Sequence, residues 1–142
     1  MELTRCLRLA VVALLLVGCS EQPIQLTCNP EIPEQYASDS PQWQPPNGET
    51  EAVRYRKAYE AFWWHCVSVK AADPLAQCPM VCSGTPAAAA GCTDGTRDLE
   101  AQLSTLLESQ SEATVIEYLR ALAATEEAHE KTAPYYKHVI GA

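Results

Sequence analysis

Apolar residues recur every three or four positions between Glu51 and Ala72, the spacing that places side chains on one face of an α-helix. Asp73 and Pro74 follow, and proline both lacks an amide hydrogen and disfavours helical geometry in the residue before it. The pattern predicts a helix over 51–72 whose buried stripe consists of Ala52, Tyr55, Tyr59, Phe62, Cys66 and Val69, widened by Trp63 and Val67.

A glycine-rich stretch separates this helix from two further helical patterns. Residues 78–95 combine three cysteines with Gly84, Gly91 and Gly95, a composition typical of an irregular connection. Leucines at helical spacing then predict a helix over 96–108, and a capping-box pattern at 109–112 predicts a helix over 111–131. A single continuous helix over 96–131 is the alternative. Because we find no convincing strand pattern, we expect an all-α fold, a small three-helix disulfide-stapled bundle over 50–142.

The first twenty residues have the pattern of an export signal. Arg5 and Arg8 precede nine uninterrupted apolar residues, 9–17, which is far shorter than the roughly 20 that span a bilayer. The sequence Leu16-Val17-Gly18-Cys19 resembles the lipobox of bacterial lipoproteins. This resemblance covers residues 1–20 only. It implies a signal peptide over 1–18, lipid (palmitate or related acyl chains) on Cys19, and, because Ser20 rather than an aspartate follows, sorting to the outer membrane.

Residues 19–49 differ from the rest of the exported chain. They hold six of the ten prolines among polar residues and have no sustained period, so they predict a Pro-rich disordered tether. Pro-rich segments extend near 3.1 Å per residue, so about thirty residues could lift a domain some tens of ångströms from a membrane. Cys28 or Trp43 could instead pin part of this segment to the domain.

Five cysteines remain after Cys6 and Cys19 are set aside, and an exported chain is in an oxidising compartment. Two disulfides and one odd cysteine leave fifteen connectivities open. Cys78 and Cys82 could reach outward to Cys66 and Cys92, which leaves Cys28 free or paired between chains. In the alternative, Cys28 bonds within the domain and another cysteine is free.

Metal and enzyme chemistry find little support in the pattern. Cys78, Cys82, Cys92 and His65 could build a zinc site, but an oxidising compartment favours disulfides. A thioredoxin-type redox centre needs two residues between its cysteines, whereas Cys78 and Cys82 have three. We therefore expect no enzyme activity, no cofactor and no metal.

The charge and the aromatic residues indicate the class of partner. A formal charge of −8 opposes nucleic-acid binding, because phosphates attract basic proteins. Trp64 and His65 project away from the centre of the buried stripe, so we expect them to be exposed partner contacts. The sequence thus predicts a lipid-anchored envelope protein, facing the periplasm, that binds a protein partner. The alternative is a surface inhibitor, immunity or exclusion protein acting against a toxin, a lysozyme, a phage or a conjugation apparatus.

Overall fold

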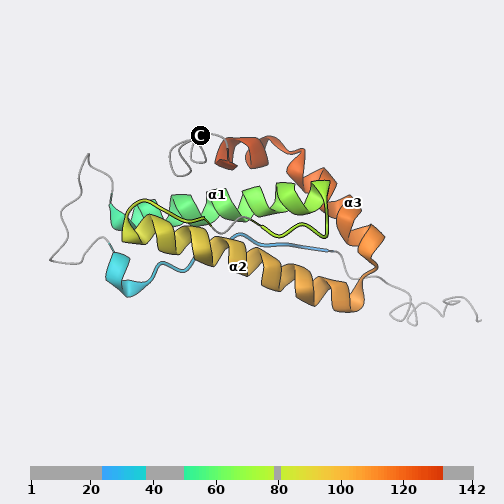
Figure 1. The fold of residues 1–142 in the computed structure, drawn as a ribbon, viewed down its shortest axis with the longest axis horizontal. Helices are drawn as coiled ribbons and strands as arrows, with labels where there is room; N and C mark the ends of the chain where they lie inside the picture. The colour runs from blue at the N-terminus through green and yellow to red at the C-terminus, as the bar shows by residue number, and fades with distance from the viewer. Residues whose placement is uncertain (1–23, 38–49, 79–80, 133–142) are drawn as a thin grey trace, which may run out of the picture.

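The computed structural model describes residues 24–37, 50–78 and 81–132, and these residues form helices and no strand (Figure 1). The elements are the short 3₁₀ helix η2 (Glu34–Tyr36) and the α-helices α1 (Glu51–Ala72), α2 (Pro86–Ser109) and α3 (Glu112–Ala123). Residues 126–132 are also helical. The expected all-α, disulfide-stapled bundle is confirmed.

A hydroxyl side chain caps the start of each long helix. Thr50, Thr85 and Ser111 accept hydrogen bonds from main-chain N–H groups three residues ahead, which satisfies donors that have no partner within the helix. The bounds predicted for the first helix are confirmed, and so is the interruption near residues 109–111.

The predicted start of the second helix at residue 96 is wrong. α2 begins ten residues earlier, because Thr85 caps it, Pro86 occupies its first turn, and an alanine run follows. Gly91 and Gly95, which we interpreted as breakers, lie inside this helix.

The predicted helix over 111–131 is two helices. Its first part, α3, ends at Ala123. The hydroxyl of Thr125 then accepts a hydrogen bond from the N–H of Ala128 at 3.2 Å and so caps the helix of residues 126–132. The break lets this last helix turn back over α1, where Lys131 pairs with Glu60 at 3.2 Å.

α1 and α2 lie side by side and run in the same direction (Figure 1). In the connection between them, residues 73–78 and 81–85 lie along the pair and are tied down at two points. Disulfides join Cys66 to Cys78 and Cys82 to Cys92, with Cα atoms 5.2 and 5.6 Å apart. The pairing in which the two middle cysteines reach outward is confirmed, and Cys28 is the free one among the cysteines that the structure describes.

Two glycines allow the backbones of α1 and α2 to touch. A Cβ atom on Gly91 would lie 2.3 Å from the carbonyl oxygen of Tyr55, and one on Gly95 would lie 2.3 Å from that of Tyr59. Real Cβ atoms do not approach an oxygen so closely. The crossing therefore requires the absence of a side chain at both positions.

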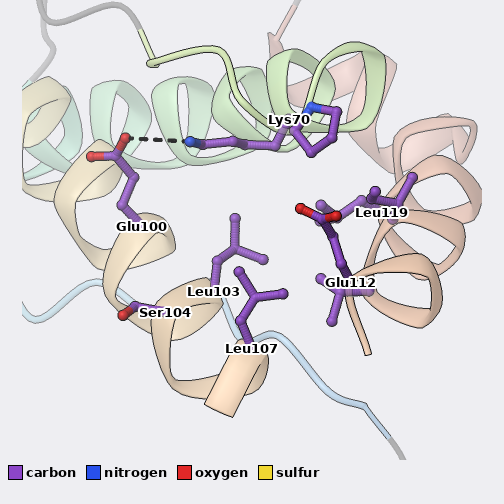
Figure 2. A pocket seen from close by; sticks show the side chains of 10 residues that line it. Lys70, Glu100, Leu103, Ser104, Leu107, Glu112 and Leu119 are labelled. Carbon is purple, nitrogen blue, oxygen red and sulfur yellow. Dashed lines mark ion pairs between the residues drawn. The ribbon is translucent and has the colours of Figure 1, made fainter. Parts of the chain in front are cut away.

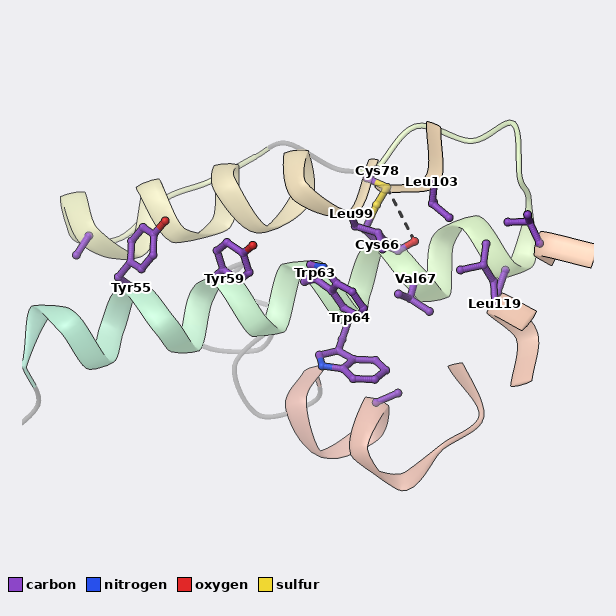
Figure 3. Packing of buried hydrophobic residues seen from close by; sticks show 14 residues of the cluster. Tyr55, Tyr59, Trp63, Trp64, Cys66, Val67, Cys78, Leu99, Leu103 and Leu119 are labelled. Atoms are coloured by element: carbon purple, nitrogen blue, oxygen red, sulfur yellow. Dashed lines mark hydrogen bonds between the residues drawn. A yellow bond between two sulfur atoms is a disulfide. The ribbon is translucent and has the colours of Figure 1, made fainter. Parts of the chain in front are cut away.

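The core lies along this crossing and continues beneath the last helix. Figure 3 shows Trp63 directed toward α2 and Trp64 directed the other way, toward the helix of residues 126–132. Arg120 of α3 donates to the carbonyl of Ala71, at the end of α1, where carbonyl groups lack helical partners. The other large buried side chains of this core include Tyr55, Tyr59, Val67, Leu99, Leu103, Val115 and Leu119.

Residues 24–37 are extended along α2, antiparallel to it, apart from η2. Thr27 meets Gln102 in the second half of α2, and Tyr36 reaches the carbonyl of Pro86 at its start. This part of the expected tether is thus fixed to the bundle, and the alternative of pinning at Cys28 is confirmed because Cys28 packs against the core. Trp43 lies outside the described residues.

Thr96 is a buried residue, 1% exposed, whose hydroxyl has no hydrogen-bond partner among the described residues. An unpaired buried polar group costs free energy, so we expect Thr96→Val to leave the free energy of unfolding unchanged or to raise it by up to about 1 kcal/mol. Urea unfolding measures this. Thr93→Val is the control, because the hydroxyl of Thr93 donates to the carbonyl of Ala89 at 3.1 Å. A loss above about 1 kcal/mol for Thr96→Val would contradict the absence of a partner.

Candidate functional site

An apolar groove opens where α3 diverges from α2 at the turn that joins them (Figure 2). Its volume is about 260 Å³. Leucines from the last turns of α2 form one wall, α3 forms the other, and the end of α1 closes it. The lining residues are Lys70, Pro74, Glu100, Leu103, Ser104, Leu107, Glu112, Val115, Ile116 and Leu119.

Charged side chains lie at the edge of the groove. Lys70 and Glu100 approach within 4.0 Å, a partly exposed ion pair of small energetic weight. Glu112 extends from the first turn of α3, where a negative charge is favourable because of the helix dipole. Leu107 is 48% exposed, so its side chain is available to a partner.

The lining of the groove is mainly apolar. Its lining residues include Leu103, Leu107, Val115, Ile116 and Leu119. What the lining offers is apolar surface with a few charges around it, the composition that accepts an apolar side chain of another molecule.

The other concentration of polar groups is a pair of tyrosine–aspartate contacts between α1 and α2. The hydroxyl of Tyr55 donates to Asp94 at 2.6 Å, and that of Tyr59 donates to Asp98 at 2.5 Å. Asn29, Glu31 and Arg97 complete an open hollow around them. Tyr55 lies against Gly91 and bonds Asp94, and Tyr59 lies against Gly95 and bonds Asp98. In both cases the aspartate follows the glycine by three residues.

Gln102 links this pair of contacts to the N-terminal segment. Its side-chain amide donates both to Asp98 at 3.1 Å and to the carbonyl of Thr27 at 2.8 Å, and its oxygen accepts from the N–H of Thr27 at 3.0 Å. The tyrosine–aspartate contacts therefore join three segments of the chain, and we interpret them as structural.

The same contacts predict a stability loss at high pH. Burial first, and then the bond to a carboxylate, raise the pKa of Tyr55 and Tyr59 above the usual value of 10. Above pH 10 the unfolded chain loses these protons while the folded chain keeps them, so the free energy of unfolding falls as the pH rises. We expect Tyr59→Phe to cost about 1.5 kcal/mol at pH 7 and to make the decline above pH 10 shallower.

Urea unfolding between pH 8 and pH 11, with absorbance at 295 nm to follow tyrosine ionisation, measures both effects. Tyr118→Phe is the matched control, because its hydroxyl accepts the N–H of Leu26 instead of donating to Asp98. An unchanged decline in Tyr59→Phe would contradict this assignment.

Trp64 and His65, which we expected to be exposed partner contacts, differ in how far they are buried. Trp64 is only 6% exposed, so that expectation is wrong. The helix of residues 126–132 covers it, and its ring packs edge-on against Trp63 with centroids 5.1 Å apart. His65 is half-buried with its ring against Phe62, and burial lowers its pKa. A role of His65 in partner binding stays a prediction.

The cysteines are arranged for cross-linking rather than for metal binding. Cys66, Cys78 and Glu100 place their ligand atoms within 4.8 Å of one another, but both sulfurs belong to a disulfide and are not thiolates. Cys82 and Cys92, counted in the possible zinc site, are also bonded to each other. Burial and the nearby carboxylates of Glu60 and Asp98 raise the pKa of Cys28 to about 12, so its thiol is a poor nucleophile at neutral pH.

Sequence reasoning missed the groove, because we assigned its leucines to the buried stripes of two helices.

No helix in the described segments has the length and hydropathy needed to cross a bilayer. Residues 1–18 and Cys19, on which the lipobox resemblance depends, lie outside the described residues. No protein-family model, curated protein or solved structure matches this chain.

Proposed function

We propose that this chain is a bacterial lipoprotein, anchored through lipid on Cys19 at the outer membrane and facing the periplasm, whose helical bundle binds another envelope protein. The lipobox residues 16–19 support the anchor. The carrying observation is that four cysteines form two disulfides while the fifth is half-buried with a raised pKa. Such bonds form and persist in oxidising compartments, including the bacterial periplasm.

The groove between α2 and α3 is the candidate contact with the partner. Interfaces have an apolar centre and a charged rim, and Leu103, Leu107 and Ile116 with Lys70 and Glu112 have this arrangement. The proposal is for a binding protein, because the groove offers mainly apolar surface to another molecule.

Two measurements test the anchor. Labelled palmitate is expected on the wild-type protein and not on Cys19→Ser, and only the wild type should remain with the membranes after high-salt washing. An intact mass before and after reduction reports the acyl chains and the two disulfides together. An unlabelled wild type, or a Cys19→Ser protein that stays on the membrane, would contradict the anchor.

A photo-cross-linking amino acid at Ile116 tests the groove. Ile116 lines the groove and is half-buried, whereas its neighbour Glu117 is exposed and does not line it. We expect the probe at position 116 to yield a discrete cross-linked envelope protein and the probe at 117 to yield much less. Equal yields from both positions, or no adduct from 116, would contradict a role for the groove.

A further inference from the structure

The N-terminal segment is fixed to the bundle close to its first described residue. Both main-chain polar groups of Thr27 bond the side chain of Gln102, at 3.0 and 2.8 Å. The N–H of Leu26 donates to the hydroxyl of Tyr118 at 3.4 Å, and the side chains of Ile24 and Leu26 pack against the core. From Ile24 onward this segment therefore moves with the bundle.

This attachment shortens the distance that can separate the bundle from the membrane when the chain is anchored by lipid on Cys19. Five residues lead from Cys19 to Ile24, and even a fully extended chain covers at most about 18 Å over that number. If residues 19–49 were all a free tether, the bundle could lie about 90 Å from the membrane. An anchored chain is thus held with Ile24 close to the membrane surface.

The end of the bundle nearest to Ile24 also carries exposed apolar side chains. α1 and α2 both end there, and the described chain enters there (Figure 1). Leu75 follows the end of α1 and is 84% exposed, and Leu107 lies in the last turns of α2 and is 48% exposed. Apolar side chains of this kind are favoured at the boundary between headgroups and acyl chains.

We propose that this end, formed by the C-terminal ends of α1 and α2, rests on the lipid surface. Leu75 contacts the headgroup region, while η2 and the starts of α1 and α2 point away from the membrane. The exposed carboxylates of Glu108 and Glu112 lie at the same end, so neutral lipid is preferred to anionic lipid. This orientation rests on the lipid anchor of the proposed function.

Energy transfer from two positions to the membrane tests the orientation. The acylated full chain is reconstituted in phosphatidylcholine vesicles that carry an acceptor dye on a lipid headgroup. A donor dye is attached through a non-natural azide side chain, which leaves the cysteines intact, at Glu108 or at Gln35 in η2. Both residues are exposed. We expect greater transfer from position 108, and equal transfer or greater transfer from position 35 would overturn the orientation.

A second comparison tests the contacts that fix the N-terminal segment to the bundle and so impose the orientation. The double variant Gln102→Ala/Tyr118→Phe removes the three hydrogen bonds to Leu26 and Thr27, and we expect it to reduce the difference in transfer by at least half. Gln110→Ala, which removes a half-buried amide in the α2–α3 turn, should keep the difference. A double variant that also keeps it would overturn the assigned role of these contacts.

Flotation with the vesicles separates this inference from the one on which it rests. A protein that does not float with them lacks the anchor, so the proposed function fails and the orientation falls with it. A protein that floats and transfers energy equally from both positions refutes the orientation alone.

Discussion

Gly95→Ala is expected to destabilise the protein by at least about 3 kcal/mol, near the upper end of the cost of overpacking a core. The new Cβ would lie 2.3 Å from the carbonyl oxygen of Tyr59 and 3.0 Å from its Cα atom, so relief requires two backbones to separate rather than one side chain to rotate. Separation would also lengthen the hydrogen bonds from Tyr55 and Tyr59 to α2.

The sign of this effect distinguishes packing from helix propensity. Alanine stabilises the interior of an isolated helix by up to about 1 kcal/mol relative to glycine, so propensity alone predicts that Gly95→Ala is stabilising. Urea unfolding of Gly91→Ala and Gly95→Ala decides between the two. Ala101→Gly, at an exposed position of α2, supplies the propensity term as the control. A gain in stability for either glycine variant would show that the helices do not touch there.

Removing the buried disulfide with Cys66→Ala/Cys78→Ala is expected to cost about 3 kcal/mol or more. Closing a loop with a sequence separation of 12 contributes about 3 kcal/mol in the chain-entropy treatment. Both sulfurs lie in the core, where Cys66 is 1% and Cys78 is 4% exposed, so their removal also leaves unfilled space. Substituting both partners avoids an unpaired thiol.

The second disulfide provides the comparison. Cys82→Ala/Cys92→Ala opens a loop with a sequence separation of 10, so its entropic effect is similar, but Cys82 is half-buried. We therefore expect a smaller loss of stability, and earlier reduction of this bond when the native protein is treated with limiting reductant. Mass spectrometry after alkylation identifies the bond that opens first. Simultaneous opening of both bonds would contradict the difference in accessibility.

Most of what was predicted of the fold came from hydrophobic periodicity and cysteine spacing. The first helix was predicted with its bounds because its apolar stripe is uninterrupted and Pro74 ends it. The sequence offered the observed disulfide pairing as one possibility among fifteen, because Cys78 and Cys82 lie between Cys66 and Cys92 and could reach outward to them. Both signals come from residues that are close together in sequence, so they do not depend on contacts with distant segments.

The errors came from residues whose role depends on another segment. Gly91 and Gly95 resemble loop residues until α1 lies against them, although the repeated order Gly-x-x-Asp over 91–98 was a usable signal of a periodic contact. Trp64 is covered by the helix of residues 126–132, which is separate from α3 and is capped by Thr125. The fixed position of residues 24–37 depends on Gln102 and Tyr118, far away in sequence.

The parallel arrangement of α1 and α2 has a consequence for how fast the chain reaches its native state. In an antiparallel hairpin, contacts begin beside the turn and spread outward, each closing a slightly longer loop. Here the contacts of Tyr55 with Asp94 and of Tyr59 with Asp98 have the same sequence separation, 39 residues. The first contact must therefore close the whole loop at once, so we expect the reduced chain to collapse more slowly than an antiparallel helical hairpin of equal length.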